Sequence, residues 1–217
     1  QMKAVIFDLD GTLLYTLENL FESANYVLKQ HGYNERTIEE IRNFVGNGVE
    51  KLIERCLPDG ADSLDFGVCL SEFKAHYSRT MYEKTRPYDG VLELLGRLKE
   101  QGIVCAVVSN KYDAAVKELC KRYFGDLIEV AAGEREDVRK KPAPDGVFAV
   151  MDRLGTRDCV YVGDSEVDIL TAKNAGLPCV SVCWGYKDEA FLVSHGAKKI
   201  AHSIEELERI LLLGRVP

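Results

Sequence analysis

Short apolar runs alternate with amphipathic stretches along most of the chain. The apolar runs are rich in β-branched residues and cover residues 4–7, 103–108, 127–130, 159–162 and 179–183. Strands without alternating polar positions are buried on both faces, which is typical of parallel sheets covered by helices. Helical periodicity covers residues 91–101, 113–123, 145–154, 165–175 and 204–213. The pattern predicts an α/β fold with a doubly wound, Rossmann-like parallel sheet.

One interval of about seventy residues breaks this alternation, because no strand pattern occurs between the first apolar run and Pro87. Apolar residues recur there at helical spacing, for example at Leu17, Leu20 and Ala24. We therefore expect an inserted α-helical cap domain over residues 15–86, on a core made of residues 1–14 and 87–217, with hinges at the two connections. A helical layer packed permanently on the core is an alternative that the sequence leaves open.

The charge of the chain limits its partners. It has 28 Lys and Arg against 35 Asp and Glu, a net charge of −7, which repels nucleic acid and anionic lipid. No apolar run reaches the about 18 residues of a membrane span. We expect the natural chain to start at Met2 rather than Gln1, without a secretion signal. Seven cysteines without a Cys-x-x-Cys pair suit the reducing cytoplasm.

Two carboxylates, Asp8 and Asp10, follow the first apolar run. Alternate side chains on extended chain point to the same side, and charges about 4 Å apart repel by roughly 4 kcal/mol at an effective dielectric of about 20. A cation such as Mg²⁺, which prefers carboxylate and phosphate oxygens, would remove this repulsion. An Asp-Gly hairpin turn is the structural alternative. Helical rather than strand periodicity from Thr16 onward disfavours it.

Three further polar clusters follow or flank apolar runs. They contain Ser109 with Asn110, Lys141 in a proline-stiffened loop, and Asp164. Each has an ordinary explanation, which is helix capping for the first and third clusters and a solvated charge run for the second. Ligands of open α/β sheets, however, bind outside the carboxyl ends of the strands. The common position of all four clusters favours one shared site.

With these motifs in order, the chain resembles the haloacid dehalogenase superfamily of phosphohydrolases. The matching residues are Asp8-Leu9-Asp10-Gly11-Thr12, Ser109, Lys141 with Pro142 and Pro144, and Gly163-Asp164-Ser165 with Asp168. The helical insert matches the α-helical cap of that superfamily. The segments Phe44-Val45-Gly46-Asn47-Gly48 and Lys140-Lys141-Pro142-Ala143-Pro144-Asp145 look most like the phosphoglycolate phosphatase group. Relatives usually carry Asp at the position of Tyr15, a departure that bears on the substrate more than on the chemistry.

The resemblance implies a Mg²⁺-dependent phosphatase that works through an aspartyl-phosphate. Asp8 would be the nucleophile, and Asp10 would be the general acid and then the general base. Asp8, the backbone carbonyl of Asp10, and Asp164 would hold Mg²⁺. Ser109, Asn110 with its neighbouring backbone N–H groups, and Lys141 would bind the phosphate. Asp168 would orient Lys141 or a water molecule.

Specificity would come from the cap. Asn47, Gly48, Lys51 and Arg42 could receive a second anionic group such as a carboxylate, although the glycines could also serve only a tight helix–helix turn. The expected partner is a small phosphorylated metabolite, with 2-phosphoglycolate as the first expectation, and the expected state is a monomer or homodimer. The alternatives are a pyrophosphatase, a sugar-phosphate phosphatase, a phosphoglucomutase-like enzyme and a non-catalytic phosphate-binding module.

Overall fold

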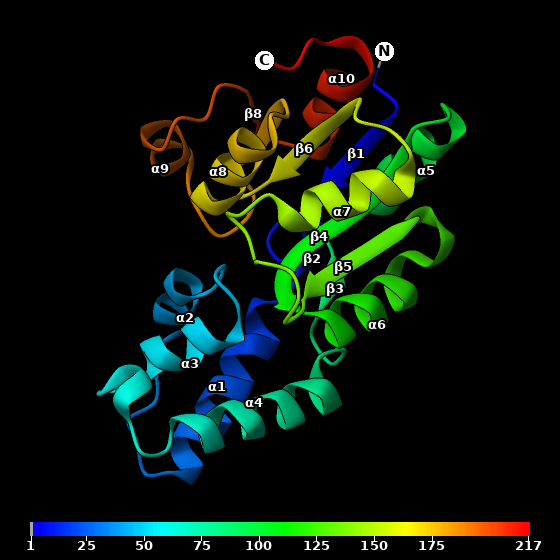
Figure 1. The fold of residues 1–217 in the computed structure, drawn as a ribbon. Coiled ribbons are helices and arrows are strands. Elements are labelled where there is room, and N and C mark those ends of the chain that lie inside the picture. The colour runs from blue at the N-terminus through cyan, green and yellow to red at the C-terminus, as the bar shows by residue number, and fades with distance from the viewer. Residues whose placement is uncertain (1) are drawn as a thin grey trace.

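A parallel β-sheet forms the centre of the larger part of the molecule (Figure 1). The computed structural model describes residues 2–217, and Gln1 lies outside the described residues. In the described part the sheet has six strands in the order β5-β4-β1-β6-β7-β8. The strands are β1 (Ala4–Phe7), β4 (Val104–Tyr112), β5 (Val130–Glu134), β6 (Cys159–Gly163), β7 (Cys179–Val182) and β8 (Ile200–Ala201). All neighbouring strands are parallel, which confirms the predicted doubly wound sheet.

Helices cover both faces of this sheet because its strands alternate between two apolar clusters. Val5 and Phe7 of β1 pack in the cluster that includes residues of α5, α6 and α10, whereas Ala4 and Ile6 pack in the cluster of α7 and α8. These helices are α5 (Val91–Glu100), α6 (Asp113–Phe124), α7 (Asp145–Leu154), α8 (Glu166–Ala175), α9 (Glu189–Ser194) and α10 (Ile204–Leu213). The chain reverses its direction of winding at β1, which lies between β4 and β6. A ligand site is expected at the carboxyl end of such a central strand.

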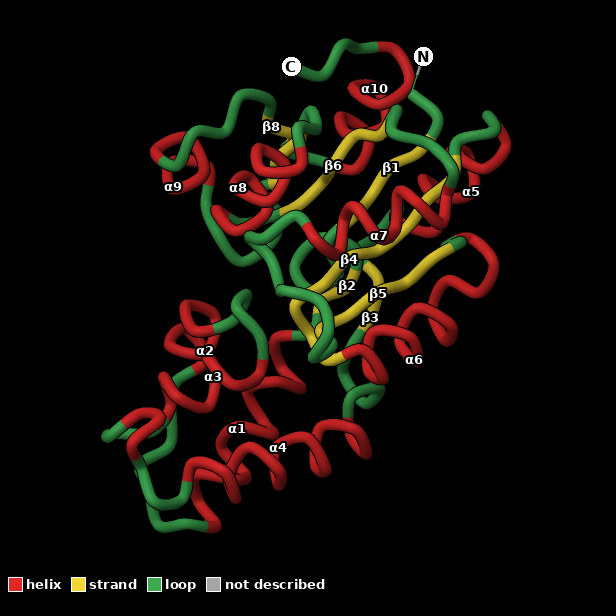
Figure 2. Tube along the Cα trace, viewed as in Figure 1, coloured by secondary structure: helices red, strands yellow, loops and turns green. Residues whose placement is uncertain are grey.

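The helical insertion lies off the carboxyl ends of the strands, as the arrowheads in Figure 1 and the tube in Figure 2 show. It contains α1 (Leu17–Gln30), α2 (Ile38–Phe44), α3 (Val49–Cys56), a short 3₁₀ turn (Gly60–Asp62) and α4 (Phe66–Thr80). Its entry strand β2 (Leu14–Tyr15) pairs antiparallel with its exit strand β3 (Arg86–Pro87). The helices therefore stand where the sequence predicts them, while a cap domain with boundaries at residues 15 and 86 stays a prediction.

Three local details differ from the sequence-based expectation. The strand predicted at residues 127–130 starts only at Val130, because Gly125–Leu127 forms a 3₁₀ turn and Ile128 packs into the core instead. Neither β8 nor α9 was expected, since two and six residues are too short to show a periodicity. Gly155 and Gly176 end α7 and α8 in left-handed conformation, as expected. None of the described helices could cross a membrane.

Candidate active site

The segment after β1 brings two aspartates to the edge of the sheet. The Asp8 N–H donates to the Val162 carbonyl at 2.9 Å, which continues the pairing with β6. The chain then turns at Gly11, where φ is +81° and a Cβ atom would lie 2.2 Å from Asp164 Oδ2. Only glycine fits this close approach. The Thr12 hydroxyl donates to Asp164 Oδ1 at 3.2 Å. The turn after β1 therefore contacts the aspartate that follows β6.

Lys141 reaches the same place from the loop before α7. Its ammonium is buried and donates to Asp8 Oδ1 and Asp168 Oδ1, both at 3.0 Å. The Tyr161 hydroxyl at 2.8 Å and the Val108 carbonyl at 2.9 Å also lie within hydrogen-bond distance, so its three N–H groups are shared among four acceptors. Burial lowers the pKa of Lys141, but the nearby charges of Asp168 and Asp8 outweigh this and raise it above its ordinary value. The ammonium is therefore a fixed positive charge beside Asp8.

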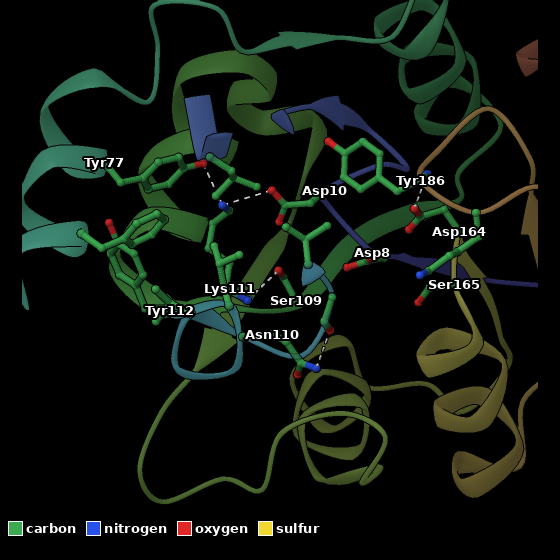
Figure 3. Close-up of a pocket in the computed structure, with 18 residues that line it drawn as sticks. Asp8, Asp10, Tyr77, Ser109, Asn110, Lys111, Tyr112, Asp164, Ser165 and Tyr186 are labelled. Carbon is green, nitrogen blue, oxygen red and sulfur yellow. Dashed lines mark hydrogen bonds and ion pairs between the residues drawn. The ribbon is translucent and has the colours of Figure 1, made fainter. Parts of the chain in front are cut away.

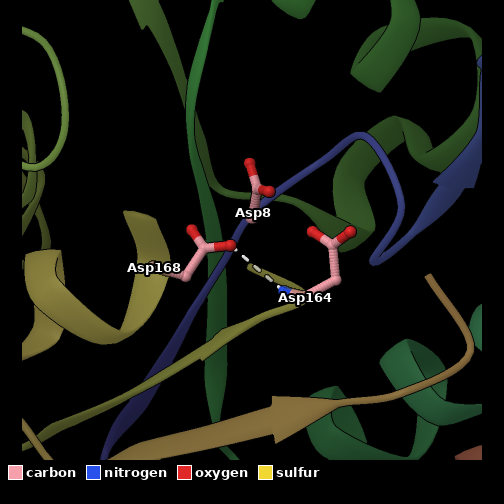
Figure 4. Close-up of side chains that lie close together, drawn as sticks. All are labelled: Asp8, Asp164 and Asp168. Carbon is pink, nitrogen blue, oxygen red and sulfur yellow. Dashed lines mark hydrogen bonds between the residues drawn. The ribbon is translucent and has the colours of Figure 1, made fainter. Parts of the chain in front are cut away.

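Asp168 lies on α8 and faces Asp8 and Asp164, as Figure 4 shows. Its Oδ1 accepts from Lys141 and, at 2.6 Å, from the Tyr161 hydroxyl. Its Oδ2 accepts from the Asp164 N–H, the Ser165 N–H and the Ser165 hydroxyl at 3.1 to 3.2 Å. Because both oxygens are already well supplied with donors, Asp168 is suited to orient Lys141 rather than to ligate a metal.

The aspartates crowd negative charge that Lys141 alone does not balance. Burial, with Asp168 as the next cause, raises the pKa of Asp164 to about 7. Burial and the charge of Asp168 also raise the pKa of Asp8 well above its ordinary value, against the lowering effect of Lys141. Oxygens of Asp8, Asp164 and Asp168 lie within 4.8 Å of one another. With Asp168 occupied by donors, Asp8 and Asp164 fit a hard divalent cation such as Mg²⁺, which favours carboxylate oxygens.

The polar end of β4 carries Ser109 and Asn110. Ser109 is buried, lines the cavity, and accepts a hydrogen bond from the Lys111 N–H at 3.1 Å. The Asn110 side chain is engaged elsewhere, since its Oδ1 accepts from the Lys141 N–H and its Nδ2 donates to the carbonyls of Lys141 and Gly46. Only the backbone N–H of Asn110 is therefore left to make the expected contact with phosphate.

A cavity of about 690 Å³, including its open mouth, separates the sheet edge from the helical insertion. The insertion gives it an apolar wall through Leu20, Val45, Val49, Leu52 and Phe73. Gly48 also lines it, but the cavity lining does not include Asn47, Lys51 or Arg42.

The two cations of the expected charged receptor on the cap, Arg42 and Lys51, do not line this cavity, and their role in binding an anion stays a prediction. Lys51 pairs with Glu54 at 2.9 Å, and Arg42 lies 3.9 Å from Glu39. Both side chains are more than a third exposed, and each lies near a glutamate of its own helix.

Sequence reasoning missed three residues that Figure 3 shows around the cavity. The Lys111 ammonium lies 3.1 Å from Asp10 Oδ1 and donates to the Tyr77 hydroxyl at 2.7 Å. The Tyr186 N–H donates to Asp164 Oδ2 at 3.1 Å. Tyr77 belongs to an apolar helical stripe and Tyr186 follows a buried strand, so the sequence marks both as packing residues. Lys111 directly follows Ser109 and Asn110, which is the one signal that could have identified it.

Comparison with known proteins agrees with this geometry. Residues 5–182 match the family described as haloacid dehalogenase-like hydrolase. The chain belongs to this family. A phosphoglycolate phosphatase of Mesorhizobium japonicum is 33% identical over 222 residues, which cover 95% of this chain and 96% of that protein. A phosphoglycolate phosphatase of Nitrosospira multiformis is 32% identical over 217 residues, covering 97% and 96%.

Solved structures show the same fold over nearly the whole chain. A family member from Lactobacillus delbrueckii subsp. bulgaricus has a TM-score of 0.93 at 36% identity, covering 98% of this chain and 99% of that one. CbbY from Rhodobacter sphaeroides, solved in complex with phosphate, has a TM-score of 0.76 at 25% identity, covering 95% and 96%. These findings confirm the expected superfamily and the expected enzyme class, a hydrolase of phosphoric monoesters.

Proposed function

We propose that this hydrolase is a Mg²⁺-dependent phosphatase that acts through an aspartyl-phosphate on Asp8, with 2-phosphoglycolate as its preferred substrate. The observation that carries the proposal is the contact of the buried Lys141 ammonium with Asp8 Oδ1 at 3.0 Å, since Asp8 lines the cavity together with Ser109 and Asp164. Four segments far apart in the sequence supply a nucleophile, a fixed cation, a hydroxyl and a further carboxylate at one point. This set is what phosphoryl transfer requires.

In the first step a carboxylate oxygen of Asp8 attacks phosphorus and the bond to the ester oxygen breaks. Burial disfavours the charged form of Asp8 that must attack, and the charge of Lys141 opposes this effect. Mg²⁺ held by Asp8, Asp164 and the backbone carbonyl of Asp10 would neutralise charge on the carboxylate and the phosphate. Ser109 and the Asn110 N–H would hold the phosphoryl oxygens.

Asp10 would move the proton in both steps. The Thr16 hydroxyl at 2.5 Å and the Lys111 ammonium at 3.1 Å both contact its Oδ1. This leaves Oδ2 to donate a proton to the departing alcohol oxygen. The same oxygen then takes a proton from the water that attacks the aspartyl-phosphate, which releases inorganic phosphate and restores Asp8.

The substrate assignment has two supports. Relatives that match 85% or more of this chain at 31–34% identity are phosphoglycolate phosphatases. The net charge of −7 also favours a small anion held in a local site over a polyanionic partner. Action in the cytoplasm, as a monomer or a homodimer, belongs to the same proposal.

The proposal is tested by measuring phosphate release from 2-phosphoglycolate, pyrophosphate, β-glucose 1-phosphate and an aryl phosphate, each with Mg²⁺ or a chelator. We expect the highest kcat/KM for 2-phosphoglycolate, only with Mg²⁺, and loss of activity in a folded Asp8→Asn variant. Equal slow rates on all esters would reject the substrate. Conversion of β-glucose 1-phosphate to an isomer without phosphate release would indicate a mutase, and inertness toward the whole panel would indicate a binding module.

A further inference from the structure

Two side chains at the cavity wall, Lys111 and Tyr77, each keep one donor hydrogen that no residue among 2–217 accepts. The Lys111 ammonium has three N–H groups, and among residues 2–217 it meets two acceptors, Asp10 Oδ1 and the Tyr77 oxygen. The Tyr77 oxygen accepts that bond, so its own hydrogen points elsewhere, and no described residue accepts it. The Tyr77 side chain is 0% exposed and that of Lys111 is 7% exposed. Buried donors without acceptors are costly, so a group of a ligand is expected there.

The surroundings of this pair define the chemistry of that group. Leu20, Leu52 and Phe73 form the neighbouring apolar wall. The other lysine that lines the cavity, Lys187, has its ammonium over the Phe191 ring at 4.9 Å. Lys111 is the lysine of the cavity lining that contacts the proposed acid, Asp10, at 3.1 Å. One charged and one neutral donor, side by side, match the two oxygens of a carboxylate.

The position of the pair relates it to the leaving group. Lys111 contacts the carboxylate of Asp10, which in the proposed mechanism protonates the ester oxygen. In 2-phosphoglycolate a single methylene separates that oxygen from the carboxylate. An ester oxygen placed at Asp10 therefore leaves the substrate carboxylate within reach of Lys111 and Tyr77, as the arrangement in Figure 3 indicates.

Resting on the function proposed above, we propose that Lys111 and Tyr77 form a carboxylate subsite. This subsite selects phosphomonoesters that carry a carboxylate one methylene from the ester oxygen. Lys111 comes from the sheet edge and Tyr77 from α4 of the helical insertion. The subsite is complete only when the insertion covers the sheet edge, so the insertion contributes to specificity through a hydroxyl.

The test compares 2-phosphoglycolate with ethyl phosphate, in which a methyl group replaces the carboxylate. The variant Tyr77→Phe keeps the ring that stacks on Phe73 and removes only the hydroxyl. We expect kcat/KM for 2-phosphoglycolate to fall about tenfold, mainly through KM, because a hydrogen bond to a charged group is lost, while ethyl phosphate changes less than about twofold. Lys111→Met should slow both substrates through its contact with Asp10, and should reduce the preference for 2-phosphoglycolate further.

The matched control is Tyr112→Phe. Tyr112 also lines the cavity, but its hydroxyl is already paired with Ser78 Oγ at 2.7 Å. Tyr112→Phe should change kcat/KM for both substrates by the same factor. A wild-type enzyme without preference between the two esters, or equal losses for both in Tyr77→Phe, would overturn the subsite.

A binding measurement separates this inference from the proposed reaction. In an Asp8→Asn background, calorimetry with Mg²⁺ should show that Tyr77→Phe weakens 2-phosphoglycolate about tenfold and leaves inorganic phosphate unchanged. This result would support the subsite even if the wild type released no phosphate from any ester. Equal weakening of both ligands would overturn the subsite even if the phosphatase reaction were established.

Discussion

The buried carboxyl of Asp164 makes the stability of the metal-free protein depend on pH. Its side chain is 3% exposed, accepts from the Thr12 hydroxyl and the Tyr186 N–H, and lies near Asp168. Burial raises its pKa from 3.8 to about 7. The folded protein therefore holds this proton at pH values where the unfolded chain has released it. Replacement by Asn removes the titrating group and keeps its size.

The sign and size of the effect follow from this difference. Between pH 3.8 and about 7 the folded state binds more protons, so the free energy of unfolding falls as the pH rises. About three pH units at 1.36 kcal/mol each give about 4 kcal/mol, of which about 2 kcal/mol lies between pH 5 and 7, because the carboxyl is half ionised at pH 7. Asp164 also raises the pKa of Asp8. The Asp164→Asn substitution therefore reduces the contribution of both carboxyls to the pH dependence of unfolding. Between pH 5 and 7 the free energy of unfolding should fall by about 2 kcal/mol less in the variant than in the wild type.

Urea unfolding with chelator at pH 5, 6, 7 and 8 measures this difference. The slopes with pH are compared rather than the absolute stabilities, because the Asp164→Asn substitution also weakens the bond from the Tyr186 N–H at every pH. Contributions of other groups, such as the lowered pKa of His76, cancel between the two proteins. Mg²⁺ at pH 8 should stabilise the wild type and not the variant. Identical slopes, or a wild type that gains stability from pH 5 to 7, would refute the reasoning.

Two further substitutions test residues around Lys141. Asp168→Asn breaks a buried ion pair and should cost about 3 kcal/mol in unfolding free energy and at least about a hundredfold in kcat, measured by urea unfolding and phosphate release. Lys140→Met removes the 2.7 Å bond to the Asn47 carbonyl, which joins the helical insertion to the loop before α7. It should raise KM several-fold, which corresponds to about 1 kcal/mol. Arg139→Met, which removes only an exposed pair with Asp145, should leave KM unchanged; equal effects of the two would contradict this role.

The sequence alone determined the sheet and the place of the site. Residues 4–7 and 159–162 are apolar at every position because they are buried on both faces, and this is a local signal. The carboxyl ends of parallel strands share one edge, so Asp8, Ser109 and Asp164 were expected to meet, and all three line one cavity. The ends of helices and strands were harder to predict from the sequence, as the later start of β5 at Val130 shows.

Tertiary structure alone decided which polar groups face the cavity. Arg42 and Lys51 have the charge of an anion receptor, but neither lines the cavity. Tyr77 occupies an ordinary core position of a helical stripe, and its hydroxyl meets the Lys111 ammonium only because α4 passes over Lys111. Spacing along a helix predicts which residues share a face, whereas the contact between two distant faces depends on how the whole chain packs.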